Sequence, residues 1–208
     1  MFDTLAKPFG RTFKLVAGSK IEESSPDIVM YDKTESGHWD NPNVDPNHRM
    51  KSYVAYMRYA RVGIMVEAKW NSNSAFSFKE HEFLLPNGAG ARAQHFLHAA
   101  EVFRASHRHH LFSIYVVKRA ARLVYFDRAG MVVSKPLDLT KEEGKRSLCK
   151  FVFSVAQMKR APLGFDTSAE LATDEDIKRI PPNPLNDYFS LCRNEMITEK
   201  DHFPIYKV

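Results

Sequence analysis

Three ionisable residues in the first third of the chain have types and spacing suited to metal-assisted hydrolysis of a phosphodiester. Residues 62–66 form an apolar run that is typical of a buried strand. Glu67 and Lys69 come at the end of this run. Because side chains on a strand alternate between its two faces, Glu67 and Lys69 are expected on the same side. Asp27 opens a second apolar run, residues 28–31. If these strands pair, the two carboxylates lie side by side at one edge of a sheet.

Two carboxylates and one lysine predict a site for magnesium or manganese. Such hard cations prefer oxygen ligands and are commonly held by one or two carboxylates, with waters and a substrate phosphate completing the shell. Asp27 and Glu67 are therefore candidate metal ligands and catalytic residues, and the backbone carbonyl of Ala68 is a natural additional ligand. The metal would polarise the phosphate and activate a water. Lys69 would orient that water or help to deprotonate it.

The same residues also admit a purely structural interpretation. Glu67 and Lys69 could be an exposed pair on an edge strand, and Asp27 could be a turn residue that follows Pro26. Gln94 is a further candidate catalytic residue because it falls on the next predicted helix. A glutamine on a helix is more often simply solvated, so this assignment depends on where the helix lies.

Basic residues later in the chain are candidates for binding nucleic acid. A phosphate backbone requires only positive charge along a path, and the candidates are Arg92, Arg104, Arg108 and Lys118. The net charge of +5 permits such a partner without requiring one, and an ordinary solvated basic face is the alternative. His95 and His98 lie one helical turn apart, which makes a zinc site conceivable, but no cysteine lies near them.

The hydrophobic pattern predicts an α/β fold with a mixed central sheet flanked by helices. Phe96, Ala99, Ala100 and Phe103 recur at helical spacing, and residues 87–90 are predicted to form a loop before that helix. Strands are predicted at residues 27–32, 61–70, 111–118, 122–126 and 131–134, and helices at residues 46–59, 91–106, 141–159 and 185–194.

Two local signals support this order of elements. Asp127 and Gly130 open and close a predicted hairpin turn, which matches the residue preferences of such turns. Thr140 and Glu143 have the spacing of a capping box and predict a helix start at that point. Residues 14–17 are compatible with either a short strand or a helix.

The length and composition predict one main domain in an intracellular protein. Residues 1–165 are assigned to the α/β domain, with an insertion at about residues 33–60, and residues 166–208 to a polar, proline-containing tail. No apolar stretch approaches the ~20 residues that span a bilayer, and the first residues lack a secretory signal pattern. Two cysteines fit a reducing compartment. We therefore expect a location in the cytoplasm or nucleus, with no membrane association.

The order Asp27, Glu67, Lys69 and Gln94, on strand, strand, strand and helix, resembles the PD-(D/E)XK phosphodiesterase superfamily. That resemblance implies a restriction-endonuclease-like fold and a magnesium- or manganese-dependent nuclease that acts on DNA or RNA. The chain departs from the family pattern in one respect. Active members often carry an acidic residue on a preceding helix, whereas Glu22 and Glu23 lie too close to Asp27 for that assignment.

Residues 24–172 also resemble the region before the catalytic lobe in the fungal-type protein kinase family. The most distinctive segment is Ala-Arg-Leu-Val-Tyr-Phe-Asp-Arg-Ala-Gly at residues 121–130, supported by residues 94–96, 112–114 and 163–167. This resemblance implies a nuclease-like module or, alternatively, a non-catalytic regulatory or docking module that binds protein partners.

Kinase activity of the chain itself is not expected. No glycine-rich loop precedes residues 66–69, no His-Arg-Asp sequence occurs, and residues 127–130 have one residue too many for the Asp-Phe-Gly type of metal motif. The chain ends about where a kinase lobe is expected to begin. The sequence is therefore interpreted as an N-terminal module without the kinase lobe.

Overall fold

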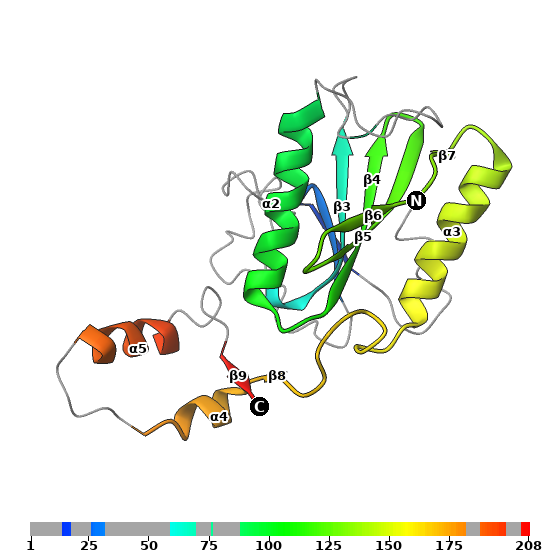
Figure 1. Cartoon of the computed structure of the whole chain (residues 1–208). Coiled ribbons are helices and arrows are strands. Elements are labelled where there is room, and N and C mark those ends of the chain that lie inside the picture. Colours follow the sequence, from blue (N-terminus) through cyan, green and yellow to red (C-terminus); the bar gives the residue numbers. More distant parts are fainter. Residues whose placement is uncertain are drawn as a thin grey trace, which may run out of the picture.

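A mixed sheet forms the centre of the molecule (Figure 1). The computed structural model describes residues 14–17, 26–31, 59–69, 76, 88–181, 188–198 and 205–208. The seven strands of the sheet are β1 (Lys14–Ala17), β2 (Ile28–Tyr31), β3 (Val62–Lys69), β4 (His110–Val117), β5 (Ala120–Asp127), β6 (Met131–Val133) and β7 (Leu137–Asp138). Their order is β1-β2-β3-β4-β5-β6, and β7 also pairs with β5. Neighbouring strands are antiparallel except β3 and β4, which are parallel.

Two long helices flank the sheet (Figure 1). Helix α2 (Ala89–Ala105) lies between β3 and β4 in the chain, and helix α3 (Glu142–Gln157) follows β7. Parallel neighbours cannot be joined by a tight hairpin, so the chain crosses from β3 to β4 through α2. The predicted mixed α/β architecture with flanking helices is confirmed.

The alternation of side chains along β3 divides the core into two clusters. Met65 belongs to the cluster that contains Ala99 and Val102 of α2, whereas Ile64 and Val66 belong to the cluster on the α3 side. This two-residue period continues beyond the apolar run. It therefore directs Glu67 and Lys69, like Met65, toward α2.

The buried face of α2 differs from the apolar spacing that predicts the helix. The buried side chains are those of His95, His98, Ala99 and Val102, and Phe96 is 42% exposed. Positions 95, 98, 99 and 102 follow the spacing i, i+3, i+4 and i+7 of a buried helical stripe. Two histidines replace apolar residues in that stripe, which explains why a purely apolar pattern does not identify it.

Several local predictions are confirmed and others are wrong. The hairpin turn is confirmed: Asp127 Oδ1 accepts backbone N–H hydrogen bonds from Ala129 and Gly130 at 2.8 and 2.9 Å. The capping box at the start of α3 is wrong, because the Thr140 hydroxyl donates to Asp138 Oδ1 instead. Residues 89–90 belong to α2 and not to the predicted loop. Of the helix predicted at residues 46–59, residues 46–58 lie outside the described residues, and Tyr59 begins a 3-10 turn, Tyr59–Arg61.

Residues 166–208 include further short elements that lie to one side of the central sheet (Figure 1). These are β8 (Glu170–Leu171), α4 (Asp174–Lys178), α5 (Tyr188–Thr198) and β9 (Tyr206–Lys207). Strands β8 and β9 pair with each other, and the Tyr206 hydroxyl donates to the carbonyl of Ala105, the last residue of α2, at 2.7 Å. Only α5 corresponds to a predicted element, and the division at residue 165 stays a prediction. No helix in the described part of the chain combines the length and apolar character needed to cross a membrane.

Candidate functional site

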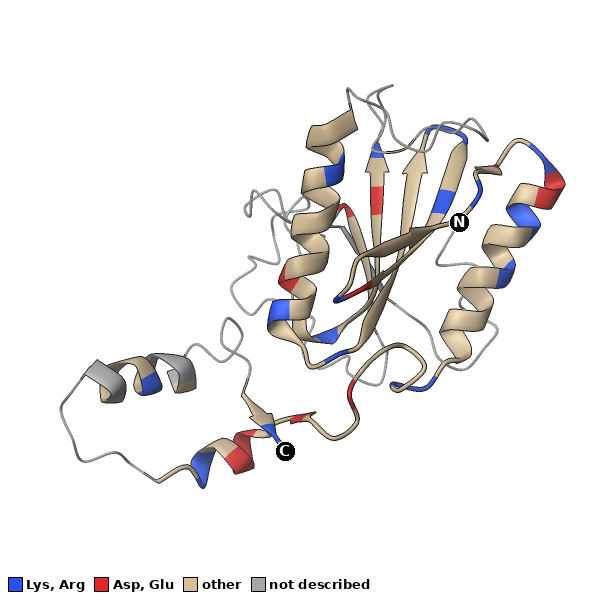
Figure 2. Ribbon diagram, in the orientation of Figure 1, with Lys and Arg blue, Asp and Glu red and all other residues tan. Residues whose placement is uncertain are grey.

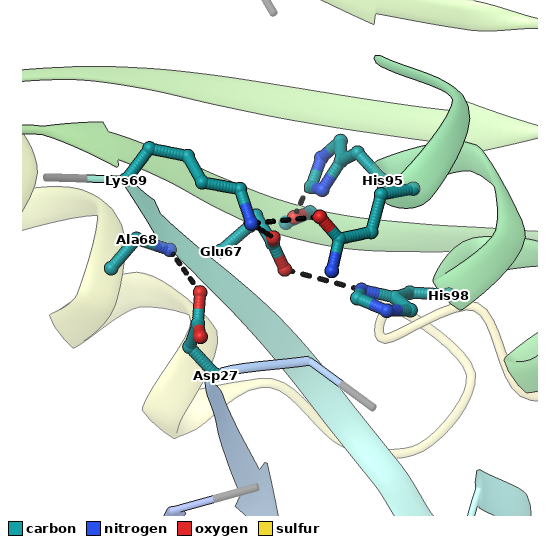
Figure 3. A network of polar contacts seen from close by, with 8 residues as sticks. Asp27, Glu67, Ala68, Lys69, His95 and His98 are labelled. Atoms are coloured by element: carbon teal, nitrogen blue, oxygen red, sulfur yellow. Dashed lines mark hydrogen bonds and ion pairs between the residues drawn. The ribbon is translucent and has the colours of Figure 1, made fainter. Parts of the chain in front are cut away.

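The antiparallel pairing of β2 and β3 brings Asp27 next to the Glu-X-Lys segment. Ile28 pairs with Val66, so the preceding residue on β2 meets the residues that follow Val66 on β3. Asp27 Oδ2 accepts a hydrogen bond from the backbone N–H of Ala68 at 2.8 Å (Figure 3). This contact makes Asp27 a fixed part of the strand end and leaves its second oxygen outside that bond.

Glu67 is buried between two partners. Its side chain is 1% exposed, Oε1 forms an ion pair with Lys69 Nζ, and Oε2 lies 3.1 Å from Nδ1 of His98. Strand β3 is an interior strand with neighbours on both sides. The interpretation of Glu67 and Lys69 as an exposed pair on an edge strand is therefore wrong.

Lys69 connects the strand to α2. Its ammonium donates to Oε1 of Gln94 at 2.8 Å while it remains paired with Glu67. Asp27, Glu67, Lys69 and Gln94 therefore belong to one network, although they come from three separate parts of the chain. The network lies at the end of the sheet where β3 finishes and α2 begins.

The surroundings shift the two carboxylates in opposite directions. Burial is the main reason that the pKa of Asp27 is raised, and the negative charge of Glu67 adds to this effect. Burial also acts to raise the pKa of Glu67, but hydrogen bonds from His98 and Lys69 and the charge of Lys69 outweigh it, so its pKa is lowered. Glu67 is thus held ionised, whereas Asp27 takes up a proton more readily. Two neighbouring carboxyl groups with separated pKa values are common in hydrolytic sites.

Sequence reasoning missed the part that His98 takes in this network. From the sequence, His95 and His98 are considered only as candidates for a zinc site. Among the described residues, neither histidine lies in a cluster of metal-binding side chains. Within the described residues, no group of three or more His, Cys, Asp or Glu side chains could hold a metal ion. The signal that could have found His98 is the helical stripe of positions 95, 98, 99 and 102, which directs both imidazoles toward the sheet.

His95 is buried beside the network and is expected to make folding sensitive to acid. Its Nε2 lies 3.2 Å from the Ser113 hydroxyl, and burial lowers its pKa from 6.5 to about 4. Between these two pH values the unfolded chain binds a proton at this residue that the folded chain does not. Stability is therefore expected to fall by about 3 kcal/mol as the pH drops through that window.

Urea unfolding of the wild type and His95→Gln at several pH values measures this effect. The variant should lose the part of the slope between pH 6.5 and 4 that His95 contributes, because the amide does not titrate. Glu67 and Asp27 contribute to the pH dependence of both proteins, so the difference between the two curves isolates His95. His109→Gln, at an exposed position, serves as the control. Equal slopes for the wild type and His95→Gln would contradict the prediction.

The four nucleic-acid candidates do not lie on one surface. Lys69 pairs with Val117 in the parallel register, so Lys118, which begins the β4–β5 turn, lies at the same end of the sheet as the network. Arg92 lies at that end as well, in the first turns of α2. Figure 2 shows Lys and Arg positions gathered around this end of β3, the β4–β5 turn and α2.

The other two candidates lie at the far end of α2. Arg104 is exposed and paired with Glu101 at 2.7 Å. Arg108 is 2% exposed, donates to the Val62 carbonyl at 2.6 Å, and has its guanidinium carbon 3.9 Å from the centroid of the Phe165 ring. The structure therefore brings Arg92 and Lys118 near the network but places Arg104 and Arg108 away from it.

The strand end carries oxygen donors of the kind that magnesium and manganese prefer. Asp27 and Glu67 offer carboxylate oxygens, and the Ala68 carbonyl lies between the motif residues. Such cations need only one or two protein carboxylates because waters and substrate phosphate supply the remaining ligands. The Oδ1 of Asp27 and the Oε1 of Glu67, now paired with Lys69, are the oxygens that would serve.

Comparison with known proteins gives a family match over the part of the chain that follows β3. The family model described as fungal protein kinase matches residues 80–200, which include Gln94, His98 and Lys118 but not Asp27, Glu67 or Lys69. No curated protein and no solved structure matches the chain. The family match covers more than half of the 208 residues, and the chain therefore belongs to the fungal protein kinase family.

Proposed function

We propose that this protein is a PD-(D/E)XK-like module that hydrolyses phosphodiester bonds in nucleic acid with magnesium or manganese. The observation that supports the proposal is the network at the strand end. Glu67 and Lys69 of β3 join each other through an ion pair, and Lys69 joins Gln94 of α2 through a hydrogen bond. Asp27, directly before β2, bonds to the backbone of Ala68 between them. Buried charged groups with perturbed pKa values are concentrated at functional sites, because burial makes them costly.

Each residue has a role that follows from its place. Asp27 and Glu67 would hold the metal, which when bound polarises a phosphate oxygen and activates a water. Lys69 would keep a positive charge beside Glu67, and Gln94 holds its ammonium on the α2 side. Lys118 and Arg92 add positive charge at the same end of the sheet, which attracts a phosphate backbone.

A cleavage assay with a conservative variant tests this function. Wild-type protein is incubated with single- and double-stranded DNA and RNA, with Mg²⁺, Mn²⁺ or EDTA. Asp27→Asn retains an oxygen for the Ala68 N–H but loses the negative charge. We expect the metal concentration for half-maximal cleavage to rise by about 10–100-fold in this variant. Absence of metal-dependent cleavage by the wild type, or equal metal requirements for the two proteins, would reject the proposal.

A non-catalytic regulatory or docking module is the second candidate function. Two observations favour it: both oxygens of the buried Glu67 are already occupied by protein groups, and the family match begins after Lys69. In that case the charged network would stabilise the fold, and the module would bind a kinase lobe. Micromolar binding of a purified kinase lobe of this family, measured by calorimetry and unchanged by Asp27→Asn, together with no cleavage, would support this alternative.

A further inference from the structure

His98 forms a hydrogen bond with the carboxylate of Glu67. Its Nδ1 lies 3.1 Å from Glu67 Oε2, and the exposed fractions of the two side chains are 0% and 1%. An ionised carboxylate can only accept hydrogen bonds, so Nδ1 carries the proton and donates it. The other ring nitrogen, Nε2, is buried and has no hydrogen-bond partner among the described residues. Glu67 is therefore the polar group that fixes the ring.

The two partners of Glu67 differ in their freedom to move. Lys69 is 24% exposed, has a long flexible side chain, and has a second acceptor in Gln94 Oε1 at 2.8 Å. His98 is completely buried in the stripe of α2 that packs on the sheet. Its ring cannot turn away without leaving a buried carboxylate oxygen unpaired, which is costly. If one partner leaves Glu67, that partner is Lys69.

We propose that His98 is the positioning residue of Glu67: it holds Oε2 through its Nδ1–H and leaves Oε1 to meet a divalent cation, with Lys69 as the partner that is displaced. This inference rests on the proposed function, since it names how the same site receives its metal. Buried donors that orient a ligating carboxylate typically change metal affinity by about 10–100-fold when they are removed.

Mn²⁺ binding tests the metal half of the inference. Free Mn²⁺ is measured by electron paramagnetic resonance with the wild type, His98→Leu, His98→Asn and His95→Leu. We expect His98→Leu to weaken binding by about 10–100-fold, and His98→Asn, whose amide N–H lies near the position of Nδ1, to recover part of the loss. His95→Leu is the matched control, since His95 is equally buried on the same helix but bonds to Ser113.

The outcomes of this experiment separate the two proposals. Failure of the wild type to bind Mn²⁺ would overturn the proposed function and the metal half of this inference together. Wild-type binding that survives His98→Leu unchanged, or that is weakened equally by His95→Leu, would overturn the role of His98 alone.

Imidazole nitrogen NMR tests the positioning half without any metal. In the wild type labelled with ¹⁵N-histidine, we expect the Nδ1 of His98 to carry a proton that exchanges slowly with solvent. Its signal should change in Glu67→Gln while that of His95 is retained. An unprotonated Nδ1 in the wild type would overturn the inference, because that nitrogen could not then donate to Glu67.

Discussion

Lys69→Met is expected to lower the turnover number for metal-dependent cleavage by about 100- to 1,000-fold, with little change in KM. A positioned group that transfers a proton or stabilises developing charge contributes roughly this much to a reaction. Gln94 Oε1 holds the ammonium of Lys69 beside Glu67, also when a cation takes the place of Lys69 at that carboxylate, whereas binding of the phosphate backbone relies on several separate cations. A loss confined to the turnover number would show that Lys69 acts in the reaction step.

The matched control for this variant is Lys145→Met on α3. Lys145 is 43% exposed and pairs with Glu142 at the surface, a contact that contributes little to stability. Both variants should unfold cooperatively in urea, so that a misfolded protein is not mistaken for an inactive one. A Lys69→Met protein that is folded and retains wild-type turnover would remove Lys69 from the mechanism.

Gly164→Ala is expected to destabilise the protein by about 2–5 kcal/mol, a large fraction of the stability of a typical domain. Gly164 has a φ of +95°, and a Cβ there would lie 2.1 Å from the carbonyl oxygen of His110. The unfavourable backbone conformation costs about 1–2 kcal/mol for an L-residue, and forcing the neighbouring strand aside costs about 1–3 kcal/mol more. Beside this close approach, the His109 N–H donates a 2.7 Å hydrogen bond to the Gly164 carbonyl. This bond joins the segment after α3 to the start of β4.

Two other glycines separate the causes of this effect in urea unfolding followed by circular dichroism. Gly144→Ala meets a comparable clash, 2.1 Å from the carbonyl oxygen of Asp138, without a positive φ. It should therefore lose only the steric part. A Cβ at Gly90 meets nothing within 4 Å, and because this residue lies in α2, Gly90→Ala should stabilise the protein by about 0.5–1 kcal/mol. Equal stability of Gly164→Ala and the wild type would contradict the close approach at His110.

Local patterns along the chain were sufficient to predict the elements near the site. The apolar run before Glu67 predicts β3, and the two-residue period correctly directs Glu67 and Lys69 to one face. The hairpin turn at Asp127 and Gly130 also follows from neighbouring residues alone. These predictions succeed because backbone geometry relates residues that are close in sequence, so no knowledge of distant partners is required.

Other features depend on contacts between residues far apart in the chain. Asp27 reaches Ala68 because β2 and β3 pair antiparallel in one register, and a shift of one residue would reverse every side chain. The burial of His98 depends on how α2 rotates against the sheet, and a histidine in the helical stripe carries no apolar signal. Arg108 looks like a surface cation in the sequence, yet the Val62 carbonyl and the Phe165 ring hold it inside. Spacing in the sequence thus predicts candidate residues for the site, whereas strand register and helix packing determine which of them meet, because both are properties of long-range packing.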